Sequence, residues 1–236
     1  MTVERGELFD LGTFELRPLD GDAPDDDTGT EPGDDGAEAP EEETVGGFVD
    51  VPAGLVHAEG ILWLVDQGVT TGVGDGRFAP ADPVTRDQMA TFLTRALELV
   101  AEGPQPFSDV PEGSTHDQAI RALVEAEITG GCAEGLYCPR DEVTRAQMAT
   151  FLDRALDLDE AEEPAGFTDV PEDFVHAAAI DRLVAAGITT GTGEGLFSPG
   201  DAVTRGQMAT FLFRALAELD DSDEGGDGED EANGDD

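Results

Sequence analysis

The sequence contains no lysine, only two cysteines and one tryptophan, and aromatic residues make up 6% of its 236 positions. All 12 basic residues are arginine, against 55 acidic residues, so the net charge is −43. A surface this acidic repels phosphate, which excludes nucleic-acid binding through a basic patch. No apolar run approaches the roughly 20 residues that span a bilayer. Two cysteines exclude both a disulfide scaffold and a four-cysteine zinc site.

Both ends of the chain have little to bury. Residues 1–19 contain E-L-F-D-L-G-T-F-E-L, which predicts a short strand-like segment, either the remnant of an upstream domain or a docking strand. Residues 20–44 are predicted to be a disordered acidic linker, and residues 220–236 a disordered acidic tail. No signal segment opens the sequence, so we expect either that the protein stays inside the cell or that its true start lies upstream.

The remaining residues are acidic as well. An acidic surface without lysine suits concentrated salt, where screening removes the self-repulsion of like charges. We interpret the composition as adaptation to salt, with GC-rich coding as the alternative.

Three repeats organise the middle of the chain, residues 45–219. The pattern F-x-D-V-P begins at Phe48, Phe107 and Phe167, and V-T-R-x-Q-M-A-T-F-L follows later in each unit. Both patterns recur at offsets of 59 and 60 residues, which chance does not produce. The predicted repeats are 48–100, 107–158 and 167–219.

Each repeat has the pattern of a helix, a glycine-rich loop and a second helix. Apolar residues with helical spacing mark the first helix. A threonine followed three residues later by glutamine opens the second helix as a capping box, at Thr85/Gln88, Thr144/Gln147 and Thr204/Gln207. One helix pair cannot bury both of its apolar faces, whereas three units that pack their second helices together can. We therefore predict a mainly all-α domain in which three helix–loop–helix repeats form a pseudo-threefold bundle.

An arginine follows each cap threonine, at Arg86, Arg145 and Arg205. The helix dipole disfavours a cation in the first turn by about 0.3–1 kcal/mol, so its recurrence needs a reason. One reason is an ion pair with a nearby acid. The other is an anion site, in which the guanidinium and the helix-start N–H groups hold a carboxylate or phosphate. A second arginine nine residues on lies on the opposite helix face and is interpreted as solvated or ion-paired, at Arg95, Arg154 and Arg214.

Other polar residues also recur. Packing or capping is the favoured role for the histidines, ahead of ligand contact and far ahead of zinc, at His57, His116 and His176. A turn-forming role is favoured over ligand contact for the aspartates three residues before each cap, at Asp82, Asp141 and Asp201. We predict no metal and no cofactor.

The two cysteines, Cys132 and Cys138, lie six residues apart in the loop of the second repeat. A disulfide across so short a loop would contribute about 2–2.5 kcal/mol and would favour an oxidising, extracellular setting. A buried, reduced pair is the alternative.

In these motifs the chain resembles the S-layer homology (SLH) domain family: F-x-D-V, a helix, G-I-T-x-G, G-x-F-x-P, then T-R and an amphipathic helix. The resemblance covers residues 45–219. It implies a three-pronged bundle that binds secondary cell-wall polysaccharide, often pyruvylated, in grooves between repeats and anchors exported proteins at the cell surface. The family's binding arginine carries over onto Arg86, Arg145 and Arg205. The family's glutamate after T-R-A is glutamine here, and the tryptophan that often follows D-V-P is replaced by Val56, Thr115 and Val175.

Three classes of function were weighed. A non-catalytic module that binds an anionic wall polysaccharide is favoured. A structural module that pairs with proteins or self-associates in a surface layer is the alternative. We predict no enzyme, because the sequence offers no acid/base pair, nucleophile–base set or metal cluster in a recognisable arrangement.

Overall fold

Residues 43–223 are described by a computed structural model, and within this range the chain is mainly helical and forms no sheet. The predicted segment 1–19 and nearly all of the predicted linker 20–44 lie outside the described residues. The last helix continues past residue 219, and the rest of the predicted tail lies outside the described range. The helices are α1 (Ala58–Asp66), α2 (Arg86–Ala96), α3 (Asp117–Glu125), α4 (Arg145–Leu156), α5 (Ala177–Ala185) and α6 (Arg205–Asp223).

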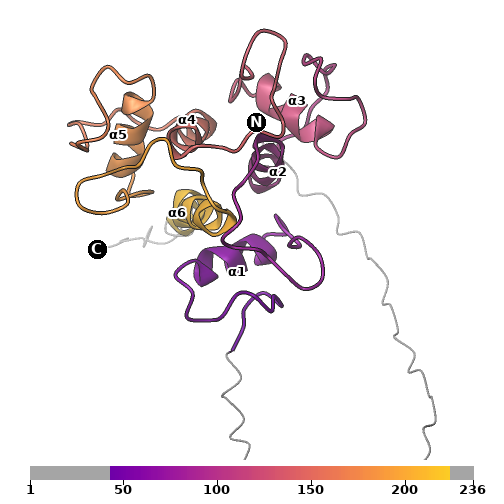
Figure 1. Cartoon of the computed structure of the whole chain (residues 1–236), viewed down its shortest axis with the longest axis horizontal. Coiled ribbons are helices and arrows are strands. Elements are labelled where there is room, and N and C mark those ends of the chain that lie inside the picture. The colour runs from indigo at the N-terminus through magenta and orange to yellow at the C-terminus, as the bar shows by residue number, and fades with distance from the viewer. Residues whose placement is uncertain (1–42, 224–236) are drawn as a thin grey trace, which may run out of the picture. The chain divides into compact units, whose positions relative to one another are not determined.

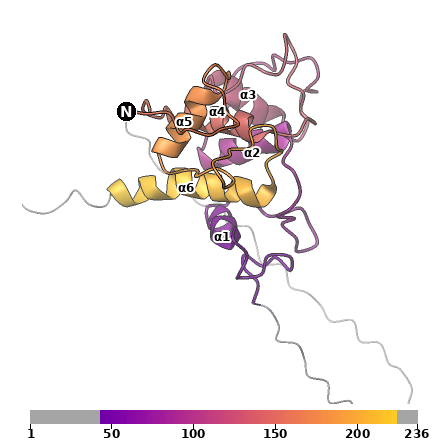
Figure 2. The same ribbon diagram turned by 60° about the vertical axis from the view of Figure 1, so that its left-hand side comes forward.

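The closest helix pairs join different repeats. The second helix of each repeat packs against the first helix of the next, so α2 lies beside α3 and α4 beside α5. The ring closes where α1 packs against α6, as Figures 1 and 2 both show. The predicted three-repeat helical bundle is confirmed. Its closest helix pairs join first and second helices, while α2, α4 and α6 lie together on the inside of the ring, as Figure 1 shows.

The repeats meet where the chain enters each second helix. Val84 N–H donates to Val203 O, Val203 N–H to Val143 O, and Val143 N–H to Val84 O, and each N···O distance is 2.9 Å. All three valines are fully buried, and the bonds form a closed cycle. Because each valine needs both of its neighbours, removing one repeat would leave buried backbone groups without partners.

Each second helix begins with the predicted cap. Gln147 N–H donates to Thr144 Oγ1 (3.2 Å), and Thr144 N–H donates back to Gln147 Oε1 (3.2 Å). Thr204 and Gln207 repeat both bonds in α6. In α2 the Thr85 N–H donates to Gln88 Oε1, and the carboxylate of Asp87 also takes part by accepting the Gln88 N–H (2.8 Å).

The loop between the helices is held by the aspartate of F-x-D-V-P. Asp109 accepts the N–H groups of Tyr137 and Cys138, each at 2.8 Å, and Asp50 and Asp169 do the same in the other repeats. Each of these bonds spans 28 or 29 residues, so the aspartate joins the start of its repeat to the end of the loop. These two bonds hold in place the aromatic residue that closes the loop. That residue is fully buried in every repeat, as Phe78, Tyr137 and Phe197.

Cys132 and Cys138 form a disulfide that closes the loop of the second repeat. The matching residues of the third repeat, Thr192 and Ser198, join the same two points by a hydrogen bond of 2.9 Å. The predicted disulfide is therefore confirmed, and it reinforces a connection that a polar pair makes elsewhere. No helix within residues 43–223 is both long enough and apolar enough to cross a membrane.

Candidate anion-binding grooves

The three repeated arginines at the helix starts are buried between aromatic rings of the following repeat. Arg145 is 4% exposed, and its guanidinium carbon lies 4.7 Å from the ring centre of Phe197 and 5.6 Å from that of Phe211. Its Nε–H donates to the Phe197 carbonyl over 2.7 Å. The same contacts recur around the ring, with Arg86 against Tyr137 and Phe151 and Arg205 against Phe78 and Phe92.

These arginines are cations without a close counter-ion. Among residues 43–217, none of them has a carboxylate oxygen within the 4.0 Å of an ion pair. The Nη2 atoms of Arg86 and Arg145 are buried and have no hydrogen-bond partner. Burial lowers the pKa of Arg145 and Arg205, because desolvation disfavours the charged form. The predicted ion pair is therefore not a direct contact, but the negative charges of Asp201 and Asp169 act on Arg145, and those of Asp82 and Asp50 act on Arg205.

A second arginine, from a different repeat, shares a groove with two of the buried ones. Arg154 of α4 and Arg86 of α2 line the same groove, and Arg95 of α2 and Arg205 of α6 line another. Each outer arginine is exposed and fixed by a bond from Nη1 to a loop carbonyl, such as Arg95 to Val69 O at 3.0 Å. The outer arginines do lie on the opposite face of their own helix from the buried ones. Sequence reasoning missed that this face meets the arginine of another repeat.

Two of the three histidines, His116 and His176, line the grooves. Each is the N-cap residue of a first helix, and its Nδ1 is bonded to a threonine hydroxyl of the neighbouring second helix, His116 to Thr91 at 2.7 Å and His176 to Thr150 at 2.6 Å. His57 and Thr210 form the third such pair at 2.8 Å. Burial and a nearby arginine lower the pKa of His57 and His176, so both are neutral near pH 7.

Two of the grooves have volumes of about 400 Å³ and about 330 Å³. The larger is lined by the loop residues from Val69 to Val73, by Gln88, Thr91 and Arg95 of α2, by Thr115 and His116, and by Arg205. Each groove therefore takes its loop and second helix from one repeat, its histidine from the next repeat and its buried arginine from the preceding one. The walls combine hydroxyl, amide, imidazole and guanidinium groups, and the smaller groove is also lined by the acidic residues Asp141 and Glu142.

The helix-start N–H groups take no part in these sites. Arg86 N–H donates to Asp141 O (2.9 Å), and Asp87 N–H donates to Pro139 O (3.1 Å). The other two helices repeat this pattern, so our expectation that these groups help to hold an anion is wrong: the neighbouring repeat already uses them. The aspartates supply the acceptor carbonyls for the arginine N–H groups, and their side chains are exposed at Asp82, Asp141 and Asp201. Asp141 also lines the groove of Arg86. No cluster of histidine, cysteine or carboxylate groups suited to a metal ion occurs in the described part of the chain.

Fold and site together define a class of protein, a ring of three helix–loop–helix repeats with polar grooves that contain arginine side chains. Comparison with known families matches the S-layer homology domain at residues 48–90, 106–149 and 166–209, more than half of the chain. The chain belongs to the S-layer homology domain family, and it is a cell-surface protein. Domains of this family are non-catalytic anchors.

Several relatives are surface-layer proteins. The chain is 31% identical to the Surface-layer 125 kDa protein of Lysinibacillus sphaericus over 69% of its own length and 14% of that protein. It is also 31% identical to the S-layer protein EA1 of Bacillus anthracis, over 70% of this chain and 19% of that one. An endoglucanase of Bacillus sp. (strain KSM-635) is 35% identical over 65% of this chain and 17% of the relative. The chain thus spans less than a fifth of the length of these relatives.

Proposed function

We propose that this chain anchors a protein to the cell wall by binding the acidic groups of a secondary wall polysaccharide in its inter-repeat grooves. The observation that supports this most strongly is the buried, unpartnered Nη2 of Arg86, whose side chain lines a groove together with that of Arg154. A buried donor without an acceptor is costly, and a carboxylate in the groove would satisfy it. A pyruvyl ketal carries such a carboxylate, as the resemblance to the family implies.

The acidic surface opposes an acidic polymer, so the balance depends on salt. At 1 M salt the Debye length is about 3 Å, which screens the distant carboxylates but not an arginine in direct contact. Grooves on one rigid ring also bind a repeating polymer together, so weak individual sites add up to firm retention.

The outer arginines give a direct test, since they are exposed and their loss leaves the core intact. The full chain and the triple variant R95Q/R154Q/R214Q are mixed with host cell walls at high salt and sedimented. Walls stripped of their secondary polysaccharide serve as the blank, and R77Q/R182Q removes positive charge outside the grooves.

We expect the wild-type chain and the control variant to sediment only with intact walls, and retention of the triple variant to fall at least tenfold. Equal sedimentation with stripped walls, or full retention of the triple variant, would contradict the proposal. Assembly that depends on protein concentration and is the same with and without the polysaccharide would favour the alternative of a self-associating structural module.

A further inference from the structure

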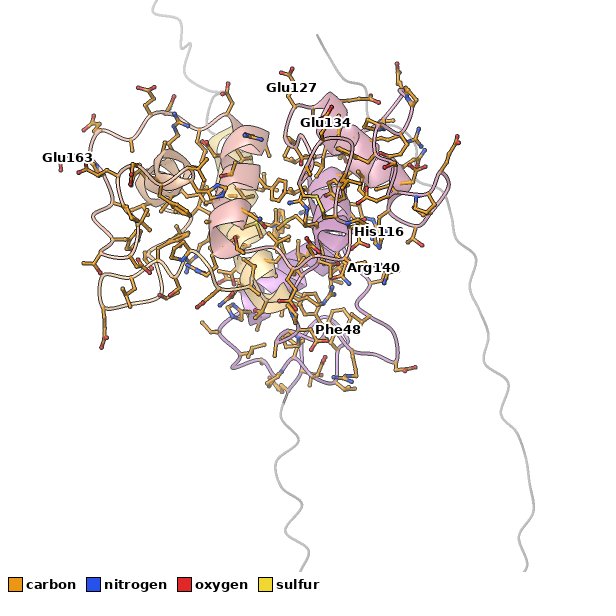
Figure 3. The ribbon with its side chains drawn as sticks, turned by 45° about the horizontal axis from the view of Figure 1, so that its top comes forward. Phe48, His116, Glu127, Glu134, Arg140 and Glu163 are labelled. Atoms are coloured by element: carbon orange, nitrogen blue, oxygen red, sulfur yellow. A yellow bond between two sulfur atoms is a disulfide. The ribbon has the colours of Figure 1, made fainter. Side chains whose placement is uncertain are left out.

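The α2/α3 pair contains a second hollow, at a place where the other two helix pairs carry a large apolar side chain, Leu55 or Phe174. This hollow has a volume of about 560 Å³ and lies on the other side of His116 from the groove of Arg205. Gln88, Thr115 and His116 line both spaces, so the two are continuous along one wall. His116 and Arg140, both labelled in Figure 3, lie on the same side of this pair and line the hollow together.

The three repeats provide an internal comparison of this place. Where the α2/α3 pair has Ser114, the other repeats have Leu55 and Phe174, which pack against the core. The ring of Phe174 lies 5.3 Å from that of His176. Three further positions are polar only here: Thr115 against two valines, Asp87 against Ala146 and Gly206, and Arg140 against Ala81 and Gly200. Four positions at one place in this helix pair therefore carry groups that form hydrogen bonds where both counterparts carry apolar residues or glycine.

The chemistry of the hollow fits a neutral hydroxyl group. Asp87 is 9% exposed, and its Oδ1 is occupied by the Gln88 N–H and the Thr85 hydroxyl. Its Oδ2 faces His116 Nε2 across 4.0 Å, too far for a hydrogen bond. An oxygen about 2.8 Å from both atoms spans this gap, and a hydroxyl can donate to the carboxylate and bond the imidazole in either tautomer. The carboxylate of Asp87 repels an acidic group at the same point.

We propose that this hollow binds an uncharged, hydroxyl-rich sugar unit next to the acidic unit held at Arg205 and Arg95. The inference rests on the proposed function, because the neighbouring groove supplies the acidic end of the same glycan. Recognition of the neutral unit is then confined to one of the three helix pairs, which gives the ring a single orientation on a repeating polymer.

The three histidines of the chain make the test specific. Imidazole carbon–proton NMR signals of the full chain are followed during titration with methyl glucoside and methyl N-acetylglucosaminide as neutral probes and with pyruvate as an acidic probe. We expect a neutral probe to shift the His116 signal, while His57 and His176 serve as internal controls. Affinity at His116 should fall about tenfold in D87A, the loss expected when a hydrogen bond to a charged group is removed.

The variant S114F places in the hollow the residue that the third repeat has, and it should abolish the response with unchanged far-UV circular dichroism. A His116 signal that neither neutral probe moves, or that still responds in both variants, would overturn the inference. If pyruvate does not shift the His116 signal of the wild-type chain, that result counts against the proposed function instead. The two failures are therefore distinguishable.

Discussion

Replacing Arg145 by alanine tests whether the groove arginines belong to the core as well as to the site. The variant loses the Nε–H bond to Phe197 and leaves that carbonyl buried without a donor, which costs about 1–3 kcal/mol. It also loses two ring contacts worth about 0.5–2 kcal/mol each. The variant also no longer buries a charged group, and this removes an unfavourable free energy that offsets part of the loss. We expect the free energy of unfolding to fall by about 3 kcal/mol and Tm by about 6–12 °C.

Two further variants separate the contributions. Methionine at position 145 keeps the volume between the rings, so R145M should cost only about 1 kcal/mol. The exposed Arg154 is the matched control, and R154Q should change stability by less than about 0.5 kcal/mol. Urea unfolding is followed by far-UV circular dichroism and by the fluorescence of Trp63, whose ring lies 6.2 Å from Phe213. A wild-type urea midpoint for R145A would refute the reasoning.

Three further predictions concern the loops. Desolvation raises the pKa of Asp169, but the N–H bonds from Phe197, Ser198 and its own backbone, together with the charge of Arg145, outweigh it and hold the pKa below its ordinary value. The contribution of Asp169 to the free energy of unfolding is therefore present above the unfolded pKa near 3.8 and lost as the pH falls through the folded value. At pH values below about 4 the urea midpoint should decrease, and the decrease should be smaller in D169N. A Cβ on Gly131 would lie 2.4 Å from Leu136 O, whereas one on Gly130 would meet nothing within 4 Å. G131A should therefore destabilise by several kcal/mol while G130A stays near wild type in thermal melts, and equal melting temperatures would be inconsistent with the loop geometry. Reducing the disulfide between Cys132 and Cys138 should lower the free energy of unfolding by about 2 kcal/mol. Reductant should therefore lower the Tm of the wild-type chain but leave the Tm of C132S/C138S unchanged.

The repeat architecture was predictable because its signals are local. Capping boxes and apolar periodicity depend on residues three or four positions apart, and the exact recurrence of two motifs identifies the repeats. The disulfide was predictable for the same reason, since Cys132 and Cys138 share one short loop.

The site could be predicted only in part, because it is assembled from three repeats. Periodicity placed Arg154 on the far side of its helix from Arg145, but it carries no information on which neighbour that side meets. In the structure that neighbour is the repeat that contributes Arg86. The occupied N–H groups at the helix starts were also beyond sequence reasoning, since their acceptors, such as Asp141 O for Arg86, lie in another repeat.

The most direct test of the central claim is a side-chain NMR titration of the buried arginines with the isolated wall polysaccharide. The Nε–H groups of Arg86, Arg145 and Arg205 are bonded to carbonyls in a buried site, so their protons exchange slowly enough to observe. We predict that the native polysaccharide shifts these signals and that a carboxyl-reduced preparation does not. Unchanged arginine signals under conditions where the chain is bound to the polysaccharide would contradict the account.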